Sequence, residues 1–117
     1  MNRIIEEVLN TINVPHAFLF FDEYTGAVGE ALRYIVYQQT DADGVLASDD
    51  AIANYVDYYD FDIYTKFNYF DLENELIEKL QKAGFTWQPS RSSGDMYEPE
   101  TGYYHKTLCF AIERSVN

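Results

Sequence analysis

The sequence has a single cysteine, Cys109, and lacks any long apolar run. One thiol excludes a disulfide within the chain and any site built from paired cysteines, and it fits a reducing cytoplasm. No stretch of about 18 apolar residues is present, so we expect no membrane-spanning helix and no membrane partner. The first residues carry acidic side chains where a secretory signal peptide needs an apolar segment, so we expect none.

Basic residues are also scarce, with 8 Lys and Arg against 20 Asp and Glu and a net charge of −12. A chain this acidic is repelled by nucleic-acid phosphates and by anionic lipid. We therefore expect no sequence-specific nucleic-acid partner. The same charge would let DNA pass close by without sticking, or would suit a basic protein partner.

The sequence is rich in aromatic residues, with 11 Tyr and 8 Phe, and 47% of its residues are hydrophobic. One stretch, Ala53–Lys66, concentrates residues typical of strands and alternates in character. Tyr59, Phe61 and Ile63 fall on one face, and the other face is mixed aromatic and acidic. At about 3.3 Å per residue it would span roughly 45 Å, so its beginning, from Ala53 to Val56, should project beyond the domain core.

Two stretches have the apolar periodicity of amphipathic helices, residues 2–12 and about 69–82. Asn68 is a plausible N-cap of the second helix, and Gly84 follows it as the natural C′ residue. Further strands are expected at 16–22, 31–40, 85–88 and 103–114. A polar loop at 41–50, with the turn signal Asp43-Gly44, would join the strand at 31–40 to the central strand Ala53–Lys66 in a hairpin.

The order of elements is then α-β-β-β-α-β-β in one domain over residues 1–117. This predicts an α+β fold, with an antiparallel or mixed sheet of four to five strands and both helices on one face. The polar stretch 90–102 is longer than most loops in compact domains, so we expect it to be functional or mobile.

No group of residues points to catalysis. Residues 39–50 resemble a calcium loop only in part, because Gln39 and Asp50 replace its first and last acids and the flanks are strands. Cys109 and His105 would lie about 13 Å apart along one strand, too far for a hydrogen bond. We expect no enzyme, no catalytic residue, no cofactor and no metal site, and the acids of the central strand suit a protein contact better than acid–base chemistry.

The second half of the chain carries a resemblance. It runs through Asp62-Ile63-Tyr64-Thr65-Lys66, the helix from Asp71 to Leu80, Lys82-Ala83-Gly84-Phe85, Asp95-Met96-Tyr97-Glu98 and Thr101-Gly102-Tyr103-Tyr104-His105-Lys106. This pattern, with the N-terminal helix and Asn13-Val14-Pro15, resembles the small tail-completion or tail-terminator proteins of long-tailed bacteriophages and prophages of Gram-positive bacteria.

The resemblance implies a structural virion protein, made in the bacterial cytoplasm and located where the tail joins the head. It implies a homo-oligomer, commonly a hexameric ring, that contacts the major tail-tube protein and the head-side connector. The loops 41–50 and 90–102 would then contact neighbouring subunits or those partners. The expected interface residues are Asp41, Asp43, Tyr55, Tyr58, Asp60, Asp62, Tyr64, Arg91, Asp95 and Tyr97. The alternative, from charge alone, is an acidic inhibitor or immunity-type protein that mimics nucleic acid and binds a basic partner.

Overall fold

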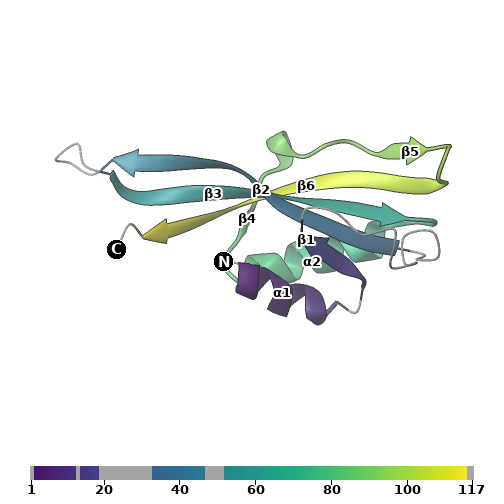
Figure 1. Cartoon of the computed structure of the whole chain (residues 1–117), viewed down its shortest axis with the longest axis horizontal. Coiled ribbons are helices and arrows are strands. Elements are labelled where there is room, and N and C mark those ends of the chain that lie inside the picture. The colour runs from purple at the N-terminus through teal and green to yellow at the C-terminus, as the bar shows by residue number, and fades with distance from the viewer. Residues whose placement is uncertain (1, 13, 19–32, 47–51, 116–117) are drawn as a thin grey trace.

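The computed structural model describes residues 2–12, 14–18, 33–46 and 52–115. Two α-helices, one short 3-10 helix and six strands occur in these residues (Figure 1). In chain order they are α1 (Asn2–Asn10), β1 (His16–Phe18), β2 (Arg33–Leu46), β3 (Ile52–Thr65), α2 (Phe70–Lys82), β4 (Thr86–Trp87), η2 (Pro89–Arg91), β5 (Met96–Glu98) and β6 (Tyr103–Ser115).

The strands form one mixed sheet in the order β1-β2-β3-β6-β4, and β5 also pairs with β6. The β1–β2 pair is parallel, and the long β2–β3 and β3–β6 pairs are antiparallel. Both α-helices lie on the same side of this sheet (Figure 1). The predicted α+β class, the sheet type and the placement of the helices are therefore confirmed. The sixth strand is β5, which the sequence pattern did not indicate.

The core lies between the helices and the sheet. It contains Leu72, Leu76 and Leu80 of α2, Ile5 and Leu9 of α1, and Ile35, Tyr37, Phe61, Ile63, Leu108 and Phe110 of the sheet, all buried. The strand residues among them alternate along the chain, so they share one face, called here the helix face. Their neighbours in β2, β3 and β6 lie on the opposite, open face.

The ends of α2 follow from local chemistry. The N-cap of α2 is Tyr69, one residue later than the expected Asn68, and its side chain makes no capping hydrogen bond. The backbone N–H of Phe70 instead donates to Asn68 Oδ1 at 2.7 Å, just before the helix begins. Past the other end, Gly84 has a φ of +103°, which side chains with a Cβ rarely adopt. The N–H of Phe85 bonds back to the carbonyl of Leu80 at 3.0 Å and turns the chain toward β4.

The prediction of a loop at 41–50 is wrong for residues 41–46, because β2 continues to Leu46. Asp43 and Gly44 do not form a turn; they pair with Val56 and Tyr55 of β3. A β-bulge at Thr40 adds one residue, so Asp41 and Asp43 lie on the open face instead of the helix face. Long-range pairing with β3 overrides the local turn propensity, and the calcium-loop alternative fails because residues 39–46 are extended. Residues 47–50 of this prediction, like 19–22 of the first strand and the loop at 23–29, lie outside the described residues.

The stretch expected to be a long loop at 90–102 instead lies against the outer edge of β6. Ser93 exchanges hydrogen bonds with the backbone of Thr107, at 2.9 Å through its N–H and at 2.9 Å through its hydroxyl. The Ser92 hydroxyl accepts from the N–H of Cys109 at 3.0 Å, and β5 then pairs with His105, Tyr104 and Tyr103. Residues 86–98 thus form an interrupted edge strand that covers β6.

His16, interpreted from the sequence as a surface residue, is largely buried and joins α1 to the sheet. Its Nε2 lies 3.0 Å from Glu6 Oε1, and its Nδ1 lies 3.1 Å from the carbonyl oxygen of Val14. The Tyr37 hydroxyl donates to the other oxygen of Glu6 at 2.5 Å. Burial, and then this carboxylate, raise the pKa of Tyr37.

Candidate protein-interaction surfaces

Three strands continue past the part of the sheet that the helices cover (Figure 1). We call this part the arm: β2 from Asp41, β3 up to Asp57 and β6 from Ala111. The three strands remain in register, with Asp43 opposite Val56 and Val56 opposite Glu113. The arm contributes to a long molecule of 53 × 26 × 24 Å. The extension that the length of β3 predicted is present, with both neighbouring strands beside it.

Most charges of the arm have partners. Asp41 lies 3.4 Å from Arg91, and Asp57 lies 2.6 Å from Arg114. Each arginine also lies over an aromatic ring, Arg91 over Tyr58 at 3.9 Å and Arg114 over Tyr55 at 4.4 Å. Asp41 and Tyr58, both predicted interface residues, are therefore already linked through Arg91 within the chain.

The carboxylate of Asp43 and one oxygen of Asp57 lack such a partner among the described residues. Asp43 is exposed, and no basic side chain of the described residues lies within ion-pair distance of it. Asp57 is only 3% exposed, and its Oδ1 has no hydrogen-bond donor in the described part of the chain. Asp43 thus faces solvent, and Asp57 Oδ1 is a buried oxygen without a donor beside an otherwise paired carboxylate.

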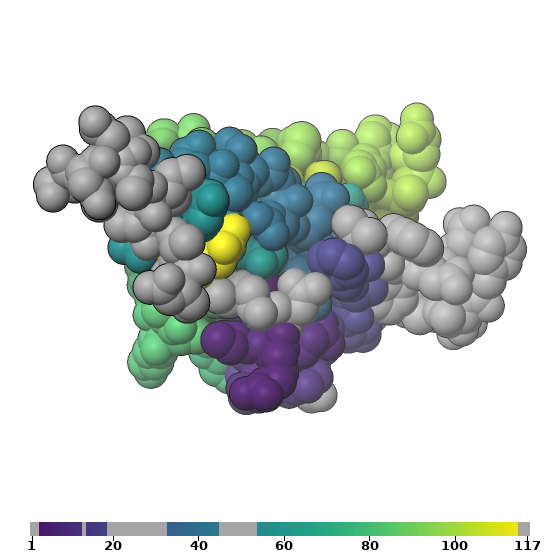
Figure 2. Space-filling view, turned by 60° about the vertical axis from the view of Figure 1, so that its left-hand side comes forward, coloured from purple at the N-terminus to yellow at the C-terminus, as the bar shows by residue number. Residues whose placement is uncertain are grey.

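The outer edge of β2 is also unpaired along the arm, as far as the described residues go. Strand β1 pairs with β2 only at Ile35, Val36 and Tyr37, and none of the other described strands continues that edge. Figure 2 shows the blue atoms of β2 at the surface above the purple helix α1. An open edge presents backbone donors and acceptors to which another chain can add a strand.

In the middle of the open face, polar side chains bond to one another and aromatic rings stack, so little of the sheet there faces solvent. Asp62 Oδ1 accepts a hydrogen bond from the Thr107 hydroxyl at 2.5 Å and lies 3.4 Å from His105 Nε2. The Tyr64 ring stacks between Tyr34, at 4.6 Å, and His105, at 4.2 Å. Burial, and then the nearby carboxylate of Asp62, raise the pKa of Tyr64 to about 12.

Asp60 lies next to Cys109 in this row. Burial, and then the charge of Asp62, raise the pKa of the Asp60 carboxyl. Burial, and then the charge of Asp60, raise the pKa of the Cys109 thiol, so at neutral pH Cys109 lacks the thiolate that a nucleophile needs. Among the described residues, no three His, Cys, Asp or Glu side chains are grouped as a metal site requires.

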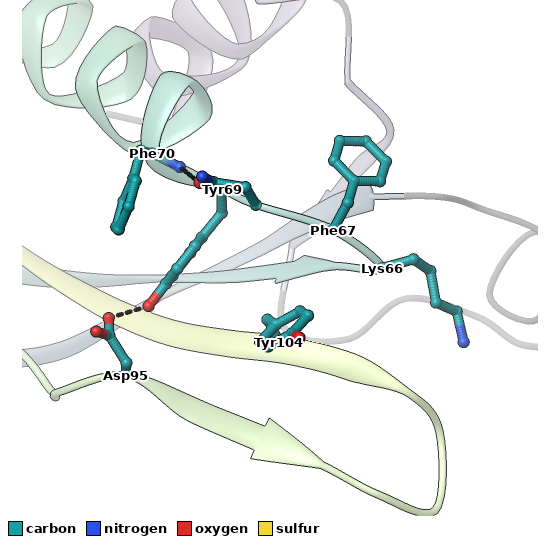
Figure 3. Close-up of a pocket in the computed structure, with 7 residues that line it drawn as sticks. Lys66, Phe67, Tyr69, Phe70, Asp95 and Tyr104 are labelled. Carbon is teal, nitrogen blue, oxygen red and sulfur yellow. Dashed lines mark hydrogen bonds between the residues drawn. The ribbon is translucent and has the colours of Figure 1, made fainter.

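At the other end of the molecule, an open hollow of about 410 Å³ lies between the start of α2 and β6 (Figure 3). We call it the aromatic groove, and it is lined by Lys66, Phe67, Asn68, Tyr69, Phe70, Asp95 and Tyr104. Beside it the rings of Tyr97 and Tyr104 contact each other in a tilted arrangement, with their centroids 4.9 Å apart. Phe67, Phe70, Tyr97 and Tyr104 are each between 42% and 56% exposed. Large rings that gather half-exposed around one hollow are typical of protein contacts.

The charged side chains in and around the aromatic groove differ in the partners they have. Asp95 accepts a hydrogen bond from the Tyr69 hydroxyl and lies 3.7 Å from Lys106. Lys106 is itself 2.9 Å from Glu73 of α2. Lys66 stands at the rim, where it donates to the carbonyl of Thr101 and lies 4.0 Å above the Tyr103 ring. No carboxylate of the described residues lies within ion-pair distance of Lys66, and its ammonium is held instead by that carbonyl and that ring.

The structure separates the predicted interface residues into three groups. Those of the arm and its base are Asp41, Asp43, Tyr55, Tyr58 and Arg91; those of the open face are Asp60, Asp62 and Tyr64; those beside the aromatic groove are Asp95 and Tyr97. Sequence reasoning missed Phe67, Phe70 and Tyr104. The position of Phe70 was a signal, because it lies off the stripe of Leu72, Leu76 and Leu80 that faces the core.

None of the helices in the described residues is both long and apolar enough to cross a membrane. Comparison with protein-family models gives no match, and no curated protein matches the sequence.

Proposed function

We propose that the protein completes the tail tube of a long-tailed bacteriophage and joins the tail to the head-side connector as an oligomeric ring. The observation that supports this most is the presence of two unlike contact surfaces at opposite ends of a long molecule. One is the arm, with a strand edge that none of the described strands pairs, and the other is the aromatic groove. Unlike surfaces on one chain form head-to-tail contacts, and these close into rings when the rotation between subunits allows it.

The remaining chemistry fits a structural role. The residues that could have suggested catalysis, Asp60, Asp62, His105 and Cys109, contact one another and close the open face. A ring with many exposed carboxylates would give a lumen through which DNA passes without adhering. In this proposal the protein is not an enzyme, needs no cofactor and is located in the virion, between head and tail.

The test is assembly on tail tubes. Purified protein should be mixed with the major tail-tube protein of the same phage, and the product examined by electron microscopy and light scattering. We expect tubes that end in a ring and stop growing. A double variant, Phe67→Ser with Phe70→Ser, should keep its fold because both rings are exposed, and it should lose the cap.

Two results would contradict the proposal. One is tube growth that continues unchanged at saturating protein. The other is a protein that stays monomeric and binds only a basic nuclease or polymerase, which is the behaviour expected of an acidic inhibitor.

A further inference from the structure

Exposed aromatic rings gather at one end of the molecule. Among the described residues seven large apolar side chains are exposed, and four of them are Phe67, Phe70, Tyr97 and Tyr104. All four lie in or beside the aromatic groove. The face of an aromatic ring carries partial negative charge, so it attracts a cation as well as an apolar group.

The carboxylate of Asp95 stands at the same hollow, and only one of its oxygens has a partner. Oδ1 accepts a hydrogen bond from the Tyr69 hydroxyl and lies 3.7 Å from Lys106. Lys106 lies closer to Glu73, at 2.9 Å, so it is shared between two carboxylates. Oδ2 of Asp95 has no donor among the described residues, and the side chain is 69% exposed. A charged oxygen beside exposed rings is a combination that binds a basic side chain.

The other charges around the aromatic groove also favour a cation over an anion. Lys66 is a lining residue, but its ammonium is held at the rim by a carbonyl and a ring, and Figure 3 shows it pointing away from Phe70 and Asp95. Asp71 follows Phe70 in the first turn of α2, is exposed, and has no basic partner among the described residues. Asp71 and Glu73 also offset the partial positive charge at the N-terminus of this helix.

Contacts elsewhere in the chain show the same combination with its cation in place. The guanidinium of Arg91 lies 3.9 Å over the Tyr58 ring and 3.4 Å from Asp41. Arg114 is held in the same way, by one ring and one carboxylate. The aromatic groove provides both elements, exposed rings and Asp95, and Oδ2 of Asp95 has no cation beside it among the described residues.

We infer that the aromatic groove binds an arginine-bearing segment of a different, basic protein. The guanidinium pairs with Oδ2 of Asp95 and lies over the rings of Phe70 and Tyr104, and an apolar side chain beside it fills the hollow of about 410 Å³. Arginine suits this site better than lysine, because its planar group stacks on rings and presents several N–H donors to one carboxylate.

A second copy of this chain is a poor source of that arginine. Two copies that each carry a net charge of −12 repel each other. Apart from Arg33, the basic side chains already contact a carboxylate or, for Lys66, a carbonyl and a ring. The inference rests on the proposed function and assigns the groove to the tail-tube or connector protein, which leaves the arm for contacts between copies.

The first experiment is an NMR titration with a defined peptide. Acetyl-Leu-Arg-Leu-amide is added to isotope-labelled protein up to millimolar concentration. The control peptide has citrulline in place of arginine, which keeps the shape and removes the charge. We expect shifts at the amides of residues 67–70, 95 and 104, and about fivefold weaker binding of the citrulline peptide. Equal binding of the two peptides, or shifts spread over the whole acidic surface, would overturn the inference.

The second experiment removes one element of the site at a time. Asp95→Asn keeps an acceptor for the Tyr69 hydroxyl, and Phe70→Leu keeps an apolar side chain without a ring. Each should weaken binding of the arginine peptide about threefold and reduce the difference between the two peptides. The matched controls are Asp43→Asn and Phe18→Leu, at an exposed acid and an exposed ring outside the groove, with circular dichroism as the check on the fold. Equal losses in the variants and their controls would contradict the site.

Further outcomes separate this inference from the proposed function. If the same amides shift when the protein alone is concentrated, the occupant is a second copy and the inference is wrong. Peptide binding in the groove without tube capping would retain this site and remove the phage assignment. Capping by Asp95→Asn protein as strong as by the unmodified protein would retain the function and remove the arginine from the contact.

Discussion

Phe61 and Asp62 are neighbours in β3, yet their side chains meet opposite surroundings. Phe61 is completely buried on the helix face, between the rings of Tyr37 at 5.9 Å and Phe110 at 5.5 Å. Asp62 lies on the open face, held by the Thr107 hydroxyl. One face of the sheet is closed by apolar packing and the other by hydrogen bonds and stacked rings. Most stability should therefore come from the helix face, while the open face specifies how the strands and the 86–98 segment are arranged.

The largest expected effect comes from emptying the helix face. Phe61→Ala removes a fully buried ring and leaves a cavity, which should cost about 3–5 kcal/mol of the free energy of unfolding. Because domains of this size are stable by about 5–15 kcal/mol, the variant should unfold at much lower urea concentrations. Phe70→Ala, which removes a ring that is 56% exposed, is the matched control and should change little. Similar midpoints for the two variants would show that Phe61 is not a core residue.

The next effect concerns the covered edge of β6. In a Ser92→Ala, Ser93→Ala double variant, the N–H groups of Cys109 and Thr107 lose their acceptors. At roughly 1 kcal/mol for each lost hydrogen bond, the cost should be about 2 kcal/mol. Hydrogen exchange at these two amides should accelerate more than elsewhere in β6. Ser90→Ala, at an exposed neighbouring position, serves as the control; equal protection in both variants would mean that the serines do not close this edge.

The helix face was predictable from the sequence because its signals are local. Tyr59, Phe61 and Ile63 alternate with polar residues, and this period of two fixes the face without knowledge of the rest of the chain. The leucines of α2 recur at helical spacing, and Gly84 marks its end. Each of these patterns is set within about one turn or one strand, so propensity and burial agree.

The parts that escaped prediction depend on distant partners. Asp43-Gly44 has the composition of a turn, but β3 is long enough to pair with it, and the ladder bonds outweigh the local preference. Strand β5 has three residues, too few for a pattern, and exists because β6 lies beside it. The aromatic groove joins the start of α2, β5 and β6, so no single stretch could reveal it.

A smaller effect should follow from the hydrogen bonds of the open face. Asp62→Asn retains the size of the side chain but weakens its bond with the Thr107 hydroxyl and its contact with His105. The expected cost is about 1 kcal/mol in urea unfolding at neutral pH. Asp43→Asn is the control because Asp43 is exposed and has no basic partner among the described residues. If both variants were equally stable, the polar closure of the open face would contribute nothing measurable.

The smallest expected effect is a change in alkaline stability that depends on Tyr64 of the open face. Tyr64 has a pKa of about 12 in the folded protein, against about 10 for an unfolded tyrosine, because burial and Asp62 disfavour its charged form. The neutral hydroxyl is thus the form that the fold accepts, so the contribution of Tyr64 is complete below about pH 10 and is lost as the pH rises from there to about 12. Tyr64→Phe cannot ionise, and it should shift alkaline unfolding, followed by circular dichroism, to a slightly higher pH while stability at neutral pH changes little. Tyr97→Phe, at a ring that is 54% exposed, should follow the unmodified protein. Coincident alkaline curves for the two variants would mean that Tyr64 ionises as freely as a surface tyrosine and that the ring stack on the open face does not exclude water.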